Sequence, residues 1–235
     1  GIVGVAQTLV VLTAGIDLSV GAIMVLSSVV MGKFAVDYGV PGPLAICAGV
    51  GVGALCGWMN GALVTRFRLP PFIVTLGAWN IFFALNLWYS ASETIRAQDI
   101  EEKAPALAFL GGSIDFLGAR LTYGSILMLL MVAACWYVLN LTAWGRHVQA
   151  VGDDADSANL AGIRTDRTLL QVYIAAGVIC GIAAWALIGR IGSVSPQAGQ
   201  TANLDSITAV VIGGTSLFGG RGSIVGTLLG ALIVG

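Results

Sequence analysis

The chain of 235 residues is strongly apolar: 57% of it is hydrophobic, 10% is charged, and the mean hydropathy is +0.91. An ordinary soluble domain carries about 25% charged residues, so this composition excludes that class. A net charge of −1 with no basic stripe excludes nucleic acid as a partner. Several apolar runs reach the roughly 20 residues that cross a lipid bilayer. The sequence therefore predicts an all-α fold, a polytopic bundle of transmembrane helices.

The first predicted element is a helix that is interrupted at Thr13–Gly21. The apolar runs Ile2–Leu12 and Ile16–Met31 would be roughly 45 Å long as one helix, against a hydrocarbon core of about 30 Å. Asp17 lies in the interruption, and an aspartate at the bilayer centre costs roughly 2.5–3.5 kcal/mol. Asp17 and Ser19 either form a polar patch on a substrate pathway or cap the helix that follows.

Uninterrupted apolar segments come next, and each is predicted to cross the membrane: Leu44–Val64, Phe72–Tyr89, Tyr123–Leu141 and Thr168–Ile188. The first of them has a face of small residues that suits close helix packing, made of Ala48, Gly49, Gly53, Ala54 and Gly57. Loops or polar stretches are expected at Lys33–Pro43, Thr65–Pro71, Ser90–Thr122 (with a short helix near Pro105–Leu110), Thr142–Arg167 and Gly189–Asp205.

Arginines concentrate in two of these polar segments, which two crossings separate. Because short basic loops stay in the cytoplasm, we place both there: Thr65–Pro71, with Arg66 and Arg68, and Thr142–Arg167, with Arg146, Arg164 and Arg167.

A second interruption is predicted near the end of the chain, where GGTSLFGGRG (Gly213–Gly222) separates Ser206–Ile212 from Ser223–Val234. Paired interrupted spans indicate a transport pathway, and tight external turns are the alternative. The chain starts and stops inside apolar runs, so we expect it to be a fragment of a longer protein.

The predicted cytoplasmic segment Gly145–Ile163 differs in composition from its surroundings. Its acids suit the start of a helix, and Gly162 suits the position just past its end. The helix between them would be short and small-surfaced, with Ala155, Ala158, Leu160 and Ala161. From spacing alone it is either a surface that seats in another protein or a plain connector.

No catalytic or metal site and no cofactor are expected. The cysteines, Cys47, Cys56, Cys135 and Cys180, lie in apolar runs without CxxC spacing and are interpreted as packing residues. His147 has no partner for catalysis. The chain has no GxxxxGKS or GxxxxGKT phosphate loop, so a nucleotide site for ATP-driven transport would be on another subunit.

Four motifs in collinear order carry a resemblance to a known family. They are TAGIDLSVG (Thr13–Gly21), NGALVTRFRLPPFIVTLG (Asn60–Gly77), GRHVQAVGDDADSANLAGI (Gly145–Ile163) and AVVIGGTSLFGGRGSIVGTLLGALIVG (Ala209–Gly235). Together they resemble the membrane permease subunit of ribose-type ABC importers, bacterial uptake systems for ribose, fructose, xylose and similar monosaccharides. The GIDLSVG form resembles the sugar branch more than the branched-chain amino-acid branch.

The resemblance implies a single permease domain over residues 1–235 that lacks outer helices at both ends. It implies a multi-pass protein of the bacterial inner membrane within a dimeric permease core, paired either with a second permease copy as a homodimer or with a relative. It further implies an ABC ATPase subunit that hydrolyses ATP and a periplasmic sugar-binding protein. The coupling loop to the ATPase falls on residues 145–167, with the contacts carried over to Gly152, Asp153, Asp154, Ala155, Ala158 and Gly162.

The residues expected on the substrate pathway are Asp17, Ser19, Asn60, Asn80 and Asn86. Amides both donate and accept hydrogen bonds, as a sugar requires, but bonds between helices use them equally. Gln197, Gln200 and Asn203 are placed at the periplasmic entrance or in a plain loop. The charged stretch Glu93–Arg120 is either a docking surface for the binding protein or a solvated crossover.

Two other classes compete with this function. A secondary transporter would use Asp17 as a coupling-ion or proton site and would need no ATPase. An intramembrane enzyme would need paired carboxylates, HExxH or a Ser–His pair, and the sequence supports none of them.

Overall fold

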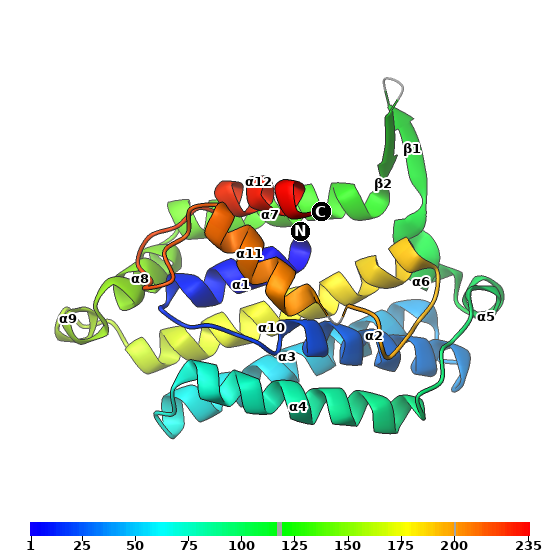
Figure 1. Ribbon diagram of the computed structural model, residues 1–235, viewed down its shortest axis with the longest axis horizontal. Coiled ribbons are helices and arrows are strands. Elements are labelled where there is room, and N and C mark those ends of the chain that lie inside the picture. The colour runs from blue at the N-terminus through cyan, green and yellow to red at the C-terminus, as the bar shows by residue number, and fades with distance from the viewer. Residues whose placement is uncertain (117–118, 200) are drawn as a thin grey trace.

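The computed structural model describes residues 1–116, 119–199 and 201–235, and almost every element in it is a helix (Figure 1). The helices are α1 (Ile2–Leu12), α2 (Val20–Val36), α3 (Gly42–Arg66), α4 (Pro71–Ser90), α5 (Ala97–Lys103), α6 (Pro105–Ala108), η1 (Phe109–Gly111), α7 (Tyr123–Leu141), α8 (Ala143–Asp153), α9 (Ala155–Leu160), α10 (Thr165–Ile191), α11 (Ala202–Ile212) and α12 (Ile224–Val234). Strands β1 (Ser113–Phe116) and β2 (Ala119–Thr122) pair antiparallel, with Ser113 opposite Thr122. The prediction of an all-α bundle is confirmed.

Among the described residues, four helices are long and apolar enough to cross a membrane: α3, α4, α7 and α10. They match the four predicted uninterrupted spans. The predicted loop at Lys33–Pro43 is wrong at its start, because α2 continues to Val36. Lys33 lies in the last turn of α2, where a cation complements the helix dipole, and it pairs with Asp37 at 3.1 Å.

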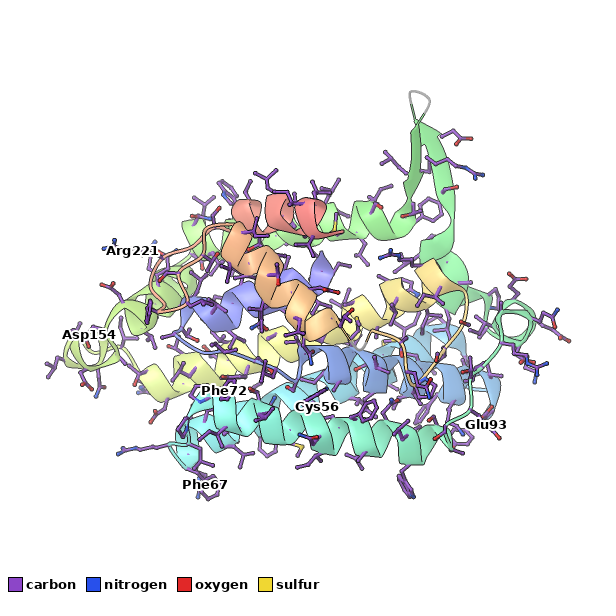
Figure 2. All side chains as sticks on the ribbon, in the orientation of Figure 1. Cys56, Phe67, Phe72, Glu93, Asp154 and Arg221 are labelled. Carbon is purple, nitrogen blue, oxygen red and sulfur yellow. The ribbon has the colours of Figure 1, made fainter. Side chains whose placement is uncertain are left out.

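The two ends of the bundle carry different segments (Figure 1). The α3–α4 turn, α8 and α9 lie at one end, which we call the inner end. Helices α5 and α6 and the β1–β2 hairpin lie at the opposite, outer end. Figure 2 shows Asp154 and Arg221 at the inner end and Glu93 at the outer end. Both arginine-bearing loops therefore share one end, as the sequence predicts.

Helices α3 and α10 pack with their backbones in contact. A Cβ atom at Gly53 would overlap the carbonyl oxygen of Gly177, and one at Gly57 would overlap that of Tyr173. This is the geometry that small residues allow between membrane helices. It confirms the small-residue face predicted on α3. Cys56 and Cys180 are buried as predicted, whereas Cys47 is exposed and is not a packing residue within the described chain.

Gly53→Ala should lower the free energy of unfolding relative to Gly51→Ala. Both changes gain about 1 kcal/mol of helix propensity. Only the first meets backbone atoms, since a Cβ at Gly51 has nothing within 4 Å. Overpacking costs roughly 1–3 kcal/mol, so the two variants should differ by that amount. Thermal unfolding of both variants in detergent measures the difference, and equal midpoints would contradict the packing described for α3 and α10.

Candidate transport pathway and coupling site

The first interruption is present in the structure as a non-helical segment between Leu12 and Val20. This segment runs back toward the middle of the bundle, where α2 begins (Figure 1). Asp17 is 1% exposed, and one of its carboxylate oxygens accepts the backbone N–H of Ser19 at 2.7 Å and its hydroxyl at 2.6 Å. The Asn60 amide donates to the Ser19 hydroxyl oxygen at 2.8 Å. Three of the predicted pathway residues thus form one buried network.

Other helices also hold this first break. The Thr75 hydroxyl on α4 donates to the carbonyl oxygen of Ile16 at 3.0 Å. Tyr173 on α10 is 1% exposed, and a Cβ at Gly15 would lie 3.2 Å from its hydroxyl. Tyr173 was not predicted, because an aromatic residue in an apolar run has no local signal. The break is therefore fixed by side chains from α3, α4 and α10.

A residue far along the chain caps α2. Ser19 makes no side-chain cap bond, and its oxygen accepts from the Asn60 amide instead. The N–H of Gly21 instead donates to the amide oxygen of Asn203 at 2.7 Å. The proposed cap by Ser19 is therefore wrong. Asn203 is 7% exposed and lies in α11 rather than in the predicted loop. Of the two glutamines predicted with it, Gln197 is exposed and Gln200 lies outside the described residues.

The second interruption, between Ile212 and Ile224, is also present and lies against the first. The N–H of Gly220 donates to the carbonyl oxygen of Leu12 at 3.0 Å, which satisfies a group at the end of α1. The hydroxyls of Thr8 and Thr227 are 2.7 Å apart and share a hydrogen bond. The second break therefore satisfies the end of α1, and α1 and α12 are joined by a hydrogen bond between their side chains.

The inner end carries the predicted short helix, α9. The Asp154 carboxylate accepts the backbone N–H groups of Asp156 at 3.0 Å and Ser157 at 3.2 Å, and the Ser157 hydroxyl at 2.7 Å. Gly162, just past the helix, has φ +88°, which suits a residue without Cβ. The predicted helix with an acidic start and a terminal glycine is confirmed.

Helix α8 precedes α9 and was not predicted. Its buried residues recur at helical spacing: Gly145, Val148, Val151 and Gly152. The backbone of Gly152 lies between the two breaks. A Cβ there would overlap the carbonyl oxygen of Leu12 and approach the nitrogen of Gly220. The proposed coupling segment therefore contacts the end of α1 and the second break at one glycine.

Asp154→Ala should make the first amides of α9 exchange with solvent faster at neutral pH. Hydrogen bonds from Ser157 and Asp156 hold the pKa of the Asp154 carboxyl below its usual value. The cap is therefore intact above the usual carboxyl range of about 3.9 and is lost only as pH falls through the lowered pKa. Hydrogen exchange of peptides over residues 153–163 measures the change. Asp156→Ala, which keeps the capping carboxylate, is the matched control and should leave exchange near wild type.

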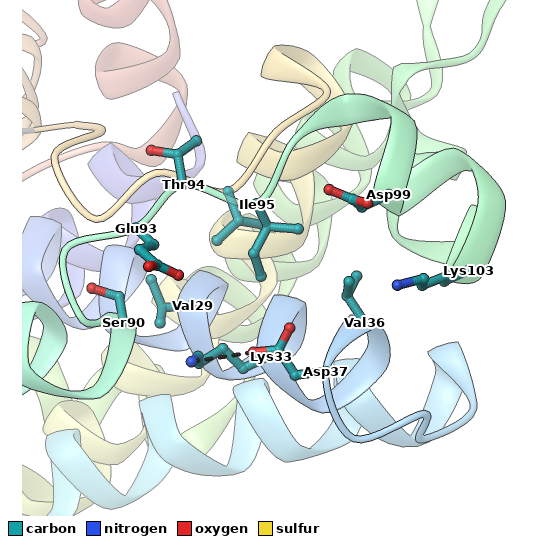
Figure 3. A pocket seen from close by; sticks show the side chains of 11 residues that line it. Val29, Lys33, Val36, Asp37, Ser90, Glu93, Thr94, Ile95, Asp99 and Lys103 are labelled. Carbon is teal, nitrogen blue, oxygen red and sulfur yellow. Dashed lines mark ion pairs between the residues drawn. The ribbon is translucent and has the colours of Figure 1, made fainter.

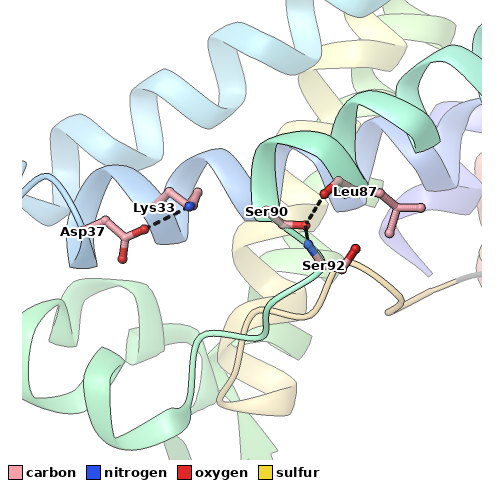
Figure 4. Close-up of polar contacts among 5 residues, drawn as sticks. All are labelled: Lys33, Asp37, Leu87, Ser90 and Ser92. Carbon is pink, nitrogen blue, oxygen red and sulfur yellow. Dashed lines mark hydrogen bonds and ion pairs between the residues drawn. The ribbon is translucent and has the colours of Figure 1, made fainter.

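Two cavities formed by described residues lie beside α2, one against α4 and the other against the end of α4 and α5. The outer cavity has a volume of about 210 Å³ and includes Lys33, Asp37, Glu93, Asp99 and Lys103 in its lining (Figure 3). Figure 4 shows that Lys33 pairs with Asp37 there, and that the Ser90 hydroxyl donates to the Leu87 carbonyl oxygen at 3.3 Å and accepts the Ser92 N–H at 3.1 Å. The central cavity has a volume of about 240 Å³ and lies by the start of α2.

The remaining predicted pathway residues, Asn86 and Asn80, lie in different parts of the structure. Asn86 is 1% exposed, lines the central cavity and donates to the carbonyl oxygen of Pro196 at 2.7 Å. Asn80 is exposed on α4 and donates to Leu76 of its own helix at 2.9 Å. The structure therefore groups Asp17, Ser19 and Asn60, and places Asn86 at a cavity and Asn80 on the surface of this chain.

Comparisons with known proteins bear on the whole chain. Residues 1–235 match the family described as branched-chain amino acid transport system / permease component. The fructose import permease protein FrcC of Rhizobium meliloti is 65% identical over 235 residues, which are 100% of this chain and 65% of that protein. The ribose import permease protein RbsC of Bacillus subtilis (strain 168) is 40% identical, over 100% of this chain and 71% of that protein. The D-allose transport system permease protein AlsC of Escherichia coli (strain K12) is 33% identical, over 100% and 69%. No solved structure matches the chain.

Proposed function

The chain belongs to the branched-chain amino acid transport system / permease component family, and on that premise we propose that it forms the translocation pathway of an ABC importer for a monosaccharide. The importer works in the bacterial inner membrane, where this chain is a multi-pass subunit. The observation that carries the proposal is the contact of Gly152 with the end of α1, where the first break begins, and with the second break. Because of this contact, a movement of α8 and α9 would directly displace the interrupted helices.

The names of the similar proteins support a sugar as substrate. The relatives at 65%, 40% and 33% identity are named for the import of fructose, ribose and D-allose. All three are monosaccharides. Fructose is the first substrate to test, because the fructose permease shares the highest identity of the three.

An ABC ATPase subunit, which carries out ATP hydrolysis, docks at the inner end. Helix α9 projects there, and Leu160 on it is 91% exposed. We assign the ATPase contact to Gly152, Asp153, Asp154, Ala155, Ala158 and Gly162. A periplasmic sugar-binding protein docks at the outer end, where the described charged residues of the stretch Glu93–Arg120 lie, and a second permease copy completes the pathway.

Reconstitution tests this function. The full-length permease, its ATPase and its binding protein are placed in proteoliposomes, and uptake of labelled fructose, ribose and xylose is measured. We expect uptake of at least one of these sugars with ATP and none with a non-hydrolysable analogue. Uptake driven by a pH gradient in the absence of ATP and ATPase would instead support a secondary transporter that uses Asp17.

A further inference from the structure

The central cavity has the mixed lining that a sugar requires. Trp79 and Phe83 contribute aromatic rings from α4, and Asn86 and Asn203 contribute amides. A pyranose or furanose ring has apolar C–H faces and a rim of hydroxyl groups. Aromatic side chains pack on such faces, while amides both donate to and accept from the hydroxyls. The volume of about 240 Å³ far exceeds the roughly 30 Å³ of one water molecule and is on the scale of a single sugar ring.

A second observation, the unpaired carbonyl oxygen of Asn86 within the described chain, also indicates a ligand in this cavity. The NH₂ group of Asn86 donates to Pro196, but its buried carbonyl oxygen has no hydrogen-bond partner among the described residues. A buried polar atom without a partner costs about 1–3 kcal/mol, and such atoms in native proteins are uncommon. A hydroxyl group in the cavity would supply the missing donor.

The central and outer cavities follow the same stripes of residues. On α2 and its C-cap residue, every fourth residue lines one of them: Gly21 and Val25 line the central cavity, and Val29, Lys33 and the C-cap Asp37 line the outer one. Residues four apart share a helix face, and the stripe is about 24 Å long at 1.5 Å per residue.

The other walls show the same succession. On α4, Phe83 and Asn86 line the central cavity and Ser90 the outer one. The segment after α10 contributes Pro196 to the central cavity and Val194 to the outer one. The two cavities therefore follow one another along α2, from its charged outer end to its first turn.

We infer that the central cavity is a binding site for a single monosaccharide in transit, formed within one permease subunit between α2 and α4. Trp79 and Phe83 pack on the sugar ring, and the Asn86 carbonyl oxygen accepts a sugar hydroxyl. The outer cavity is the mouth of this site. The inference rests on the proposed function and adds the residues that hold the substrate.

Matched pairs of variants test the site in the reconstituted full-length importer, with labelled D-fructose as the probe. Trp79→Ala and Phe83→Ala should each lower ATP-driven uptake at least tenfold. Trp88→Ala, also on α4 but 78% exposed, should leave uptake unchanged. Asn86→Ala should lower uptake similarly, while Asn140→Ala should not, because that amide donates only to its own helix on the surface of α7.

A chemical readout keeps the test decisive where a variant folds poorly. Ala198→Cys places a thiol in the lining of the central cavity. D-Fructose should slow the extra labelling of this thiol by a maleimide at least tenfold, whereas sucrose should not, and Trp88→Cys should be unaffected by either sugar. Equal uptake in Trp79→Ala and Trp88→Ala, together with no protection of Ala198→Cys, would overturn the site and leave the proposed function standing. A wild-type importer that takes up no sugar with ATP would overturn both.

Discussion

Gly152→Val should abolish ATP-driven sugar uptake while leaving the spanning helices folded. The new side chain would overlap the carbonyl oxygen of Leu12 and reach the backbone of Gly220. Relief of such overpacking costs roughly 1–3 kcal/mol and requires a backbone shift. That shift moves α8 away from both breaks, so the ATPase should still hydrolyse ATP without moving sugar. Uptake and ATP hydrolysis are measured together in proteoliposomes.

Gly51→Val is the matched control for this change, because a Cβ at Gly51 has nothing within 4 Å. It should keep both uptake and ATP hydrolysis near wild type. Gly152→Val with normal uptake would show that contact between α8 and the breaks is not needed for coupling.

Asp17→Ala should lower the free energy of unfolding by roughly 1–3 kcal/mol and largely remove uptake. The change leaves the N–H and hydroxyl of Ser19 buried without their acceptor. The Ser19 hydroxyl, which accepts the Asn60 amide of α3, also loses the group that orients it. Thermal unfolding and uptake are measured on the same preparation.

Asp17→Asn distinguishes this structural role from an ion-binding role. Asparagine keeps a side-chain oxygen that accepts from Ser19, so the variant should stay close to wild type in stability and in ATP-driven uptake. A coupling-ion site would instead lose transport when the carboxylate is neutralised. Complete loss of uptake in a stable Asp17→Asn protein would therefore contradict the role that we assign to the network.

The spans and both breaks could be predicted because membrane thickness and the cost of a buried charge are local constraints on sequence. Helix α8 was missed, since Arg146 and His147 interrupt the apolar pattern that Val148 and Val151 continue. The cap of α2 could not be predicted either. It comes from Asn203, 182 residues away, and no local pattern reports such a contact.

The candidate site was predictable in its polar part only. A polar residue in an apolar run is conspicuous, so Asp17, Ser19, Asn60 and Asn86 were all identified. The sequence could not show that the first three meet, or that Asn80 turns outward. Trp79, Phe83 and Tyr173 gave no signal, because aromatic residues in a membrane helix equally suit contact with lipid.

Hydrogen exchange on the full-length permease, with and without its bound ATPase, tests most directly whether docking at α9 reaches the helix breaks. We expect ATPase binding to slow exchange in α9 and also in residues 13–19 and 213–223, with α7 unchanged. In Gly152→Val only α9 should respond. Slower exchange in α9 of the wild type, with no change in either break, would contradict the proposed mechanism of coupling.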